Sequence, residues 1–386
     1  MGKCEKDSLS TAGFDKMCEV ISNARVVVIG EQNHGIGTDY ENFAFLVKYL
    51  HEEKGFDVVL QEYSFFDFGQ INKDVQNGES AQEYRQAMYW PQGKAKENDI
   101  LFDYIDLQNR SNTPIYMEGF DSRFFQRDSF YYYFDSIINT NKYSDLIPKS
   151  KVPVFMETLS NLMKHEYRDT LSSNSQKKDF YSIIDFAVDK SKTANIKPRM
   201  KQLLKNIKSF AINAWNPNGY DISDPDRFAE RREQMAENII WLCEKIYPNK
   251  KIIIRMHNGH AAKNHSVLNR LLPDSLQSER KNTGTIIDEY FSDKAFFIGT
   301  THYSGTYSKW DFKPIEIPKP DDFYIESELR EKGLDYAFVD IRDKGDFYMY
   351  YNEFNTWIEG GIKAPYGKLF DALIFIDDVK MPTEKK

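Results

Sequence analysis

Residues 25–30 read Arg-Val-Val-Val-Ile-Gly, and residues 31–35 read Glu-Gln-Asn-His-Gly directly after them. The β-branched run predicts a strand that is buried on both faces, as in a parallel sheet. The polar segment after it carries a carboxylate, Glu31, and an imidazole, His34. Open α/β sheets bind their ligands at the carboxyl ends of the strands. This stretch therefore predicts an α/β fold with a candidate site in the turn after its first strand.

Four further apolar runs also end in ionisable residues. They are residues 57–61 before Glu62, residues 114–117 before Glu118 and Asp121, residues 251–256 before His257 and His260, and residues 295–301 before His302. A parallel sheet would gather all five ends at one edge. Five ends that carry carboxylates and imidazoles predict an assembled active site at that edge.

Helical patterns alternate with these runs near the start of the chain. From residue 40 to residue 53, apolar side chains recur at spacings of three and four, at Phe43, Leu46, Val47 and Leu50. Gly55 ends this helix, because a helix C-terminus favours a residue that tolerates positive φ. The helix and its two strands form a βαβ unit, for which a right-handed crossover is expected. A second helix, around residues 99–108, precedes the third strand.

The segment between residues 121 and 250 is too long for a simple crossover. Its apolar spacing predicts helices at residues 153–165, 178–190, 200–214 and 227–246. Further strands are expected at residues 336–341 and 372–376. The fold class is therefore α/β, with a parallel-sheet core and flanking helices formed by residues 1–121 and 246–386. Residues 122–245 are expected to form a large, mostly helical insertion that returns to the core and caps the C-terminal ends of the strands.

The composition is typical of a globular protein of 386 residues, with 41% hydrophobic residues, 28% charged residues and a net charge of −8. No basic stripe accumulates, so a nucleic-acid partner is not expected. No apolar run approaches the roughly 20 residues that span a bilayer, and residues 1–7 lack an apolar signal region, so we expect no membrane association and a cytoplasmic location. The sequence has no Cys-x-x-Cys pair, because its three cysteines are widely spaced, at Cys4, Cys18 and Cys243. This spacing disfavours a thiol redox pair or a zinc knuckle. The oligomeric state is not predicted.

The turn after the first strand has a functional and a structural interpretation. His34 would lie near a helix N-terminus, whose positive end favours the neutral imidazole that a general base requires. Glu31 could orient the ring, as the acid of a catalytic triad does. Asn33 and Gly35 could instead serve only the backbone geometry of a turn. We favour function, because a Glu and a His together in one such turn have no structural need.

The glycines of this turn partly match the dinucleotide-binding fingerprint. Gly35 and Gly37 have its spacing, and Glu62 lies at a suitable distance. However, Tyr40 replaces the third glycine, and Gly35 comes five residues after the strand rather than at its end. A nucleotide is therefore not expected, and no other cofactor is predicted.

Two later segments extend the candidate site. A carboxylate at the end of an apolar strand, such as Glu62, is either a buried partner of an arginine or histidine or a catalytic acid or base. A lone histidine is usually a satisfied core residue, but His257 and His260 with Asn258 between them favour oxyanion stabilisation, substrate binding or a metal. The metal interpretation is disfavoured, because its ligands would match no known zinc spacing: His34, His257, His260, Glu31 and Glu62.

Residues 231–238 read Arg-Arg-Glu-Gln-Met-Ala-Glu-Asn at the start of the last predicted helix of the insertion. Composition alone favours a solvated charged helix face. The functional interpretation instead has Arg231 pointing into the cleft as an anion clamp.

Two common catalytic motifs do not occur in the sequence. There is no Gly-x-Ser-x-Gly nucleophile elbow and no phosphate-binding Gly-rich loop that ends in Lys and Ser or Thr. His and Glu without a Ser or Cys nucleophile leave general-base activation of water or of a substrate hydroxyl.

In their order along the chain, these segments resemble the erythromycin esterase family. The resemblance runs from about residue 25 to about residue 310 and rests on residues 30–35, residues 49–57, Glu62, residues 119–121, Arg231, residues 235–238 and residues 257–260. Each piece is short, but their joint order and spacing are specific. The fold of the family, an α/β core with a helical insertion, agrees with the prediction above.

The resemblance implies a metal-independent esterase. His34 would act as general base on a water molecule that attacks an ester or lactone carbonyl, while Glu31 and Glu62 position the base and the water. The predicted catalytic residues are His34, Glu31, Glu62, His257 and His260. The predicted substrate-binding residues are Asn33, Asp121, Arg231, Asn258 and His302.

The chain departs from the family pattern around the substrate. Phe43 stands where members with macrolide activity usually carry an arginine, and the acid that is common just after the His-Gly pair is displaced to Asp39. Arg255 and Arg232 stand where an aromatic or aliphatic residue and an aspartate are frequent. The catalytic residues are thus expected to be kept while the substrate-facing residues have changed, so erythromycin itself is not the expected substrate.

Three hypotheses follow, all with a small-molecule or peptide natural product as partner. The leading one is a His-dependent hydrolase of an ester or lactone in a sizeable natural product, in antibiotic resistance or natural product tailoring. A second is a lyase, cyclase or acyl transferase that uses the same general base on a peptide or polyketide. A third is a binding protein that keeps the cleft without catalysis.

Overall fold

A computed structural model describes most of the chain. The described residues are 14–21, 23–89, 91–111, 113–140, 143, 145–164, 170–216, 226, 228–264, 266–267, 277–309, 311–349 and 362–386. The expectations for the N-terminal segment and Cys4, and for the first residue of the helix predicted at 227–246, lie outside these residues.

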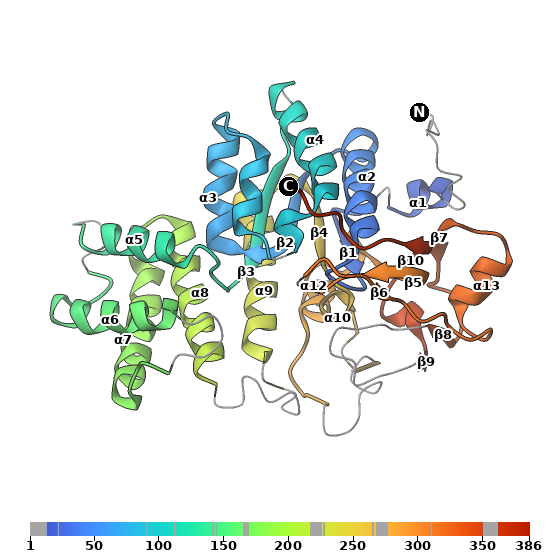
Figure 1. The fold of residues 1–386 in the computed structure, drawn as a ribbon. Coiled ribbons are helices and arrows are strands. Elements are labelled where there is room, and N and C mark those ends of the chain that lie inside the picture. The colour runs from blue at the N-terminus through green and yellow to red at the C-terminus, as the bar shows by residue number, and fades with distance from the viewer. Residues whose placement is uncertain are drawn as a thin grey trace.

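The central sheet has the strand order β3-β2-β4-β1-β5-β10-β7 (Figure 1). Its strands are β1 (Val26–Glu31), β2 (Phe56–Ser64), β3 (Tyr116–Asp121), β4 (Lys251–His257), β5 (Ala295–Tyr307), β7 (Tyr336–Asp340) and β10 (Ala372–Val379). Only β7 pairs antiparallel within this path, and β6 (Ile315–Glu316) pairs antiparallel with the end of β5. A short hairpin of β8 (Phe347–Met349) and β9 (Ile362–Ala364) stands apart. The prediction of an α/β fold with a mostly parallel sheet is confirmed.

The five predicted strand ends are neighbours in this sheet. The chain steps from β1 to β2 and β3 in one direction, returns to insert β4 between β2 and β1, and then adds β5 on the other side of β1. The register pairs Glu31 at the end of β1 with His257 at the end of β4. Strand β2 runs two residues beyond Glu62, with a register irregularity between Gln61 and Ser64. Insertion of β4 brings segments that are far apart in sequence to one sheet edge.

Helices cover both faces of the sheet because successive strand residues point to opposite sides. One face packs against α1 (Phe14–Ile21), α2 (Gly37–Lys54), α3 (Phe65–Gln76) and α4 (Asp99–Arg110). The other packs against α9 (Ala229–Trp241), α12 (Thr283–Phe291) and α13 (Ile325–Glu331). The remaining short helical segments are η1 (Ala81–Ala87), η2 (Gln92–Lys94), η3 (Lys96–Asn98), η4 (Lys149–Lys151), η5 (Leu242–Ile246, a π-helical continuation of α9), α10 (Asn258–Ala261), η7 (Ser292–Lys294) and η8 (Tyr366–Lys368).

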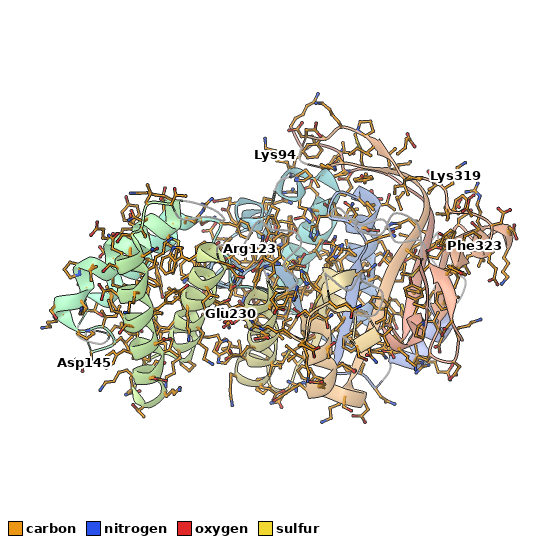
Figure 2. The ribbon with its side chains drawn as sticks, turned by 90° about the horizontal axis from the view of Figure 1, so that it is seen from below. Lys94, Arg123, Asp145, Glu230, Lys319 and Phe323 are labelled. Atoms are coloured by element: carbon orange, nitrogen blue, oxygen red, sulfur yellow. The ribbon has the colours of Figure 1, made fainter. Side chains whose placement is uncertain are left out.

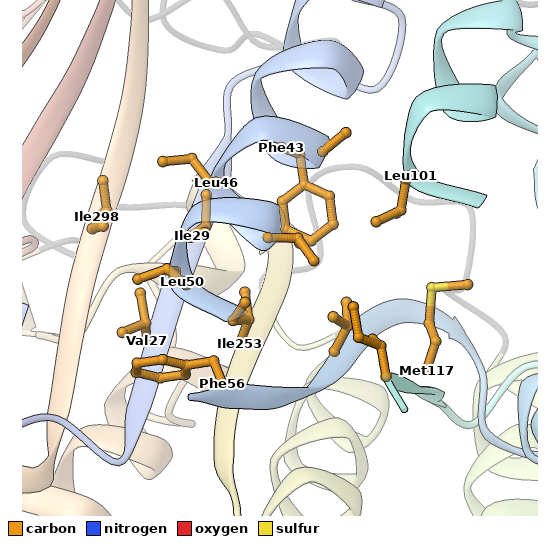
Figure 3. Close-up of a cluster of buried hydrophobic side chains, with 14 of the residues drawn as sticks. Val27, Ile29, Phe43, Leu46, Leu50, Phe56, Leu101, Met117, Ile253 and Ile298 are labelled. Atoms are coloured by element: carbon orange, nitrogen blue, oxygen red, sulfur yellow. The ribbon is translucent and has the colours of Figure 1, made fainter. Parts of the chain in front are cut away.

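Helix α2 shows how the sequence pattern forms the core. Its predicted apolar stripe, including Phe43, Leu46 and Leu50, is buried against Val27 of β1 and Ile253 of β4 (Figure 3). Gly55 at its C-terminus has φ of 71°, in the left-handed region where a Cβ is disfavoured, and its N–H bonds the carbonyl of His51. The helix therefore ends where the sequence predicted, and β2 begins at once.

The insertion forms a helical cluster beyond the edge strand β3. Helices α5 (Arg127–Ile138), α6 (Val152–Lys164), α7 (Asn174–Thr193) and α8 (Pro198–Trp215) surround their own apolar core. In two views they gather at the end of the molecule opposite to α13, with Asp145 at one end and Phe323 at the other (Figures 1 and 2). A partly buried ion pair between Arg199 of α8 and Glu118 of β3, at 2.6 Å, connects the cluster to the sheet.

The insertion meets the strand ends at β2 and β3. Helices α5 to α8 lie beside β3, and their apolar core includes Phe66 and Phe124, which follow the ends of β2 and β3. In α8, Oγ of Ser209 donates to Oγ of Ser122 at 3.2 Å. Arg123 and Arg231, near the two ends of the insertion, reach the candidate site. Helix α9, with which the insertion was expected to return to the core, packs on the sheet through its apolar side chains.

Within the described ranges, no helix combines the length and the apolar character needed to cross a membrane.

Candidate active site

The turn between β1 and α2 holds an oriented histidine. Nδ1 of His34 lies 2.6 Å from Oε1 of Glu31. A carboxylate only accepts hydrogen bonds, so Nδ1 carries the proton and Nε2 is left with a free lone pair. The Tyr40 hydroxyl donates to the backbone carbonyl of His34 and fixes the turn to the first helical turns of α2. The side chain of His34 is 35% exposed, whereas that of Glu31 is 8% exposed. The buried acid thus holds a base that can be reached from outside.

The two groups shift the pKa of one another. Burial alone would raise the pKa of Glu31, but the charges of Arg255 and His34 outweigh it and lower the pKa to about 2. Burial alone would lower the pKa of His34, but the charge and hydrogen bond of Glu31 raise it above the ordinary histidine value. Glu31 is therefore ionised near neutral pH, and His34 is a stronger base than a solvated histidine.

Arg255 supplies a second partner for Glu31. Its Nη2 donates to Oε2 of Glu31 at 2.5 Å, and its guanidinium carbon lies 4.8 Å from the ring centroid of Phe43 and 5.0 Å from that of Tyr40. Two of the departures from the family pattern, Phe43 and Arg255, are thus in contact. Arg255 thus extends from β4 and packs against two aromatic rings of α2, where cation–π attraction helps to hold it.

Glu62 lies in a dense set of polar contacts. Its Oε1 accepts from Nη2 of Arg231 at 2.7 Å, and its Oε2 accepts from the backbone N–H of His257 at 3.1 Å. Burial alone would raise the pKa of Glu62, but His260, the permanent cation Arg231 and the backbone N–H of His257 lower it well below its ordinary range. Glu62 is therefore a fixed carboxylate in the site.

Arg231 is buried rather than part of a solvated helix face. Its Nε donates to Oδ1 of Asp121 at 3.0 Å and its Nη2 to Oδ2 at 2.8 Å, a bidentate pair. Asp121 also accepts from Nε of Arg123 at 2.8 Å and from the hydroxyl of Tyr89 at 3.1 Å. The composition-based preference for a solvated face was therefore wrong. The pairing of Arg231 with two carboxylates also leaves it little free charge to clamp an anion.

The two histidines after β4 have different surroundings. His260 Nε2 lies 3.5 Å from both Oε1 of Glu62 and Nη1 of Arg231. Burial lowers the pKa of His260 to about 3, with Arg231 acting in the same direction and Glu62 against it, so its imidazole is neutral. His257 donates from Nε2 to the carbonyl of Gln32 at 3.0 Å and accepts at Nδ1 from the N–H of Gly259 at 3.1 Å. Its ring centroid lies 5.5 Å from that of His34.

Three predicted substrate-binding residues make contacts within the protein. Oδ1 of Asn33 accepts from the N–H of Gly35 at 2.8 Å. The amide of Asn258 bridges to β5, with Nδ2 donating to the carbonyl of Thr300 at 2.8 Å, and a Cβ on Gly30 would lie 2.1 Å from its Oδ1. His302 is fully buried, with Nε2 2.8 Å from Oδ1 of Asp39. The structure does not bring the side chain of Asn258 or of His302 into contact with His34, Glu31 or Glu62.

A cavity of about 10 Å³ lies between the catalytic candidates. Its lining consists of Glu31, His34, Gln61, Glu62, Tyr63, Tyr89, Gln92 and Arg255. A volume of this size holds about one water molecule. Sequence reasoning did not assign Gln61, Tyr63, Tyr89 or Gln92 to the site. Polar residues inside apolar strands, Gln61 in β2 and Arg255 in β4, were the available signal, whereas nothing in the sequence marks Tyr89 and Gln92.

Among the residues that the structure describes, no group of three or more His, Cys, Asp or Glu side chains could hold a metal ion.

Comparisons with known proteins place the chain in a family. The family model described as erythromycin esterase matches residues 51–379. A protein of Bacillus subtilis (strain 168), named "Putative hydrolase YbfO", is 25% identical over 373 residues, which cover 86% of this chain and 78% of that protein.

Three solved structures share the fold. A Bacillus cereus protein matches with a TM-score of 0.74 and 21% identity, over 97% of this chain and 93% of its own. A succinoglycan biosynthesis protein matches with a TM-score of 0.75 and 16% identity, over 98% and 94%. A mutant of the erythromycin esterase EreC in its open conformation matches with a TM-score of 0.62 and 12% identity, over 96% and 94%. Together with the match of the family model over most of the sequence, these likenesses lead to one conclusion: the chain belongs to the erythromycin esterase family.

Proposed function

We propose that this protein is a hydrolase of a carboxylic ester or lactone in which His34 is the general base. The observation that carries the proposal is the geometry of His34, whose Nδ1 is held by Glu31 at 2.6 Å while Nε2 has no partner among the described residues. This is the arrangement in which an acid fixes the tautomer of a catalytic histidine. Family membership and the hydrolase name of the relative YbfO support the same class of reaction.

The reaction follows from these contacts. Nε2 of His34 takes a proton from water as the water oxygen bonds to the substrate carbonyl carbon, and the carbonyl electrons move to its oxygen. Glu31 stabilises the imidazolium that forms. When the tetrahedral adduct collapses, the bond to the leaving oxygen breaks and His34 returns the proton to it. Glu62, kept ionised by Arg231, provides a second fixed negative group beside the water.

The cavity supports hydrolysis because it provides room for water beside His34. Its volume of about 10 Å³ is about that of one water molecule. The substrate itself would approach from the side where His34 is exposed, so its size is not limited by this cavity. A sizeable natural product is therefore the proposed substrate class. The changed pair Phe43 and Arg255 supports a substrate other than erythromycin.

The test combines a substrate screen with an isotope label. Activated esters, simple lactones and macrolides are incubated with the protein in water enriched in a heavy oxygen isotope, with and without a chelator. Hydrolysis requires one labelled oxygen in the acid product, and the chelator should have no effect. A product without label would contradict hydrolysis and favour a lyase, cyclase or acyl transferase, and a ligand recovered unchanged from a tight complex would favour a binding protein.

A further inference from the structure

The cavity beside His34 has polar groups suited to one water molecule. It is lined by acceptors, the carboxylates of Glu31 and Glu62, and lies against the base His34. A buried water usually makes two to four hydrogen bonds, and it needs a donor as well as acceptors to be held in one orientation. A water molecule in the cavity is therefore held in one orientation only if a lining side chain has a free N–H or O–H to donate to it.

Most donors around the cavity are already bonded to protein groups. Nε2 of Gln61 donates to Sδ of Met117 at 2.8 Å, and the hydroxyl of Tyr89 donates to Asp121 at 3.1 Å. Nη2 of Arg255 donates to Glu31, and the guanidinium of Arg255 lies over the rings of Tyr40 and Phe43. Among the neutral side chains of the lining, Gln92 has an Nε2 with no acceptor among the residues that the structure describes, although the side chain is buried at 3% exposure.

Hydrogen bonds to Tyr63 and Asn98 fix the position of Gln92. The hydroxyl of Tyr63 donates to its Oε1 at 2.9 Å, which fixes the amide plane and leaves Nε2 as the free end. The backbone carbonyl of Gln92 accepts from Nδ2 of Asn98 at 2.9 Å. The Tyr63 ring is stacked on Phe68, with centroids 4.8 Å apart. The pKa of Tyr63 is raised by burial, so its hydroxyl stays protonated and acts as a donor. The amide is thus preorganised, as a group that positions a reactant must be.

We propose that the cavity seats the nucleophilic water and that Gln92, oriented by Tyr63, is the residue that positions it. This inference rests on the proposed hydrolase function. The water donates one proton to Nε2 of His34 and the other to a Glu62 oxygen, and it accepts from Nε2 of Gln92. Its remaining lone pair forms the bond to the carbonyl carbon. Gln92 is a positioning residue, because it neither gains nor loses a proton in the reaction.

The test uses an alternative nucleophile. p-Nitrophenyl acetate is hydrolysed in aqueous methanol, and acetate is compared with methyl acetate among the products. The cavity has about the volume of one water molecule, so the wild-type protein should give mainly acetate. Gln92→Ala removes the donor and enlarges the seat, so hydrolysis should fall about 10- to 100-fold, as for a reactant misplaced by about 1 Å, while the share of methyl acetate rises. KM should change little compared with kcat.

Matched variants separate positioning from a structural effect. Gln86→Ala changes an exposed glutamine six positions earlier and should leave both products unchanged. Tyr63→Phe should give a smaller loss than Gln92→Ala. The double variant should be no worse than Gln92→Ala alone, because Tyr63 acts through Gln92.

The outcomes distinguish the inference from the function on which it rests. Folded Gln92→Ala protein with wild-type hydrolysis and wild-type product ratio, alongside inactive His34→Ala, would overturn the Gln92 inference and leave the proposed function standing. Hydrolysis that survives His34→Ala, or wild-type protein that hydrolyses none of the esters and lactones of the substrate screen, would overturn both.

Discussion

Nδ1 of His34 lies 2.6 Å from Oε1 of Glu31, the last residue of β1. Glu31 also accepts from Arg255 of β4, so one carboxylate joins the base to a cation from the neighbouring strand. The register of β1 against β4 makes this possible, because Ile29 lies beside Arg255 and Glu31 beside His257. The orientation of the base therefore depends on the pairing of two strands that are more than 200 residues apart in sequence.

Replacement of His34 should abolish turnover without loss of the fold. His34→Ala removes the proton acceptor, and general-base catalysis contributes about 10²- to 10⁴-fold, so kcat should fall by about that factor. Initial rates on the best ester of the substrate screen measure the loss, and thermal unfolding checks the fold.

His51→Gln provides the matched control for this substitution. His51 lies near the other end of α2, where its Nδ1 is 2.8 Å from the hydroxyl of Tyr104, and it has no contact with the site. The control should keep wild-type activity. Equal losses in the two variants would show that the effect is structural rather than catalytic.

Glu31 should set the pH at which the enzyme becomes active. His34 must be neutral to accept a proton, so kcat/KM should rise with pH through the pKa of His34, which Glu31 raises above the ordinary histidine value. Glu31→Gln removes the negative charge, so the pKa of His34 should fall and the rising limb should move to lower pH. The plateau rate should also fall, by about 10- to 10⁴-fold, because the imidazolium loses its partner. A limb that stays in place would mean that another group titrates there.

The fold could be predicted largely from local patterns, but the arrangement of the site could not. Runs such as Val26 to Ile29 and the stripe of α2 have strong periodicity, and each became the expected element. The insertion of β4 between β2 and β1 depends on long-range packing, which a single sequence does not reveal. The same is true of helices α5 to α8, whose apolar faces pack on each other beside β3.

Part of the candidate site could be predicted from the strand ends, because Glu31, His34 and Glu62 each follow or end a buried strand at the open edge. His302 was predicted on the same ground, but β5 continues to Tyr307 and buries that ring against Asp39. Gln92 could not be predicted in this way, because it lies in η2, after β2 and α3, and meets the candidate site only through tertiary contacts such as that with Tyr63.

Arg231 should be essential for stability because it neutralises two buried carboxylates. Arg231→Met would leave Glu62 without its cation and Asp121 with Arg123 alone, and loss of one partner of a buried pair costs about 3–5 kcal/mol. The free energy of unfolding in urea measures this loss. Addition of Glu62→Gln to Arg231→Met should recover part of it, because one unpaired charge is removed.

Lys281→Met is the control for Arg231. Lys281 pairs with Glu289 at 2.6 Å, but both side chains are about half exposed, and such surface pairs contribute little. The urea midpoint should not change measurably. A loss for Arg231→Met as small as that of the control would contradict the buried pairing.

His260 should make the protein less stable in acid. Its pKa in the folded protein is lowered to about 3, while in the unfolded chain it has the ordinary value of about 6.5. Between these values the unfolded state binds a proton that the folded state does not, so the free energy of unfolding falls as pH falls through this window. From about pH 8 to about pH 5 this group alone accounts for about 2 kcal/mol.

Urea unfolding of His260→Gln at the two pH values tests this linkage, because glutamine does not titrate. The acid-induced loss of stability should be smaller in the variant by about that amount, whatever its stability at the higher pH. His34→Gln should act in the opposite direction. The pKa of His34 is raised, so its contribution is present below the ordinary histidine pKa and is lost as pH rises through the folded value, and its removal should steepen the acid loss. The same pH dependence in His260→Gln and in the wild-type protein would show that the buried imidazole is not held neutral.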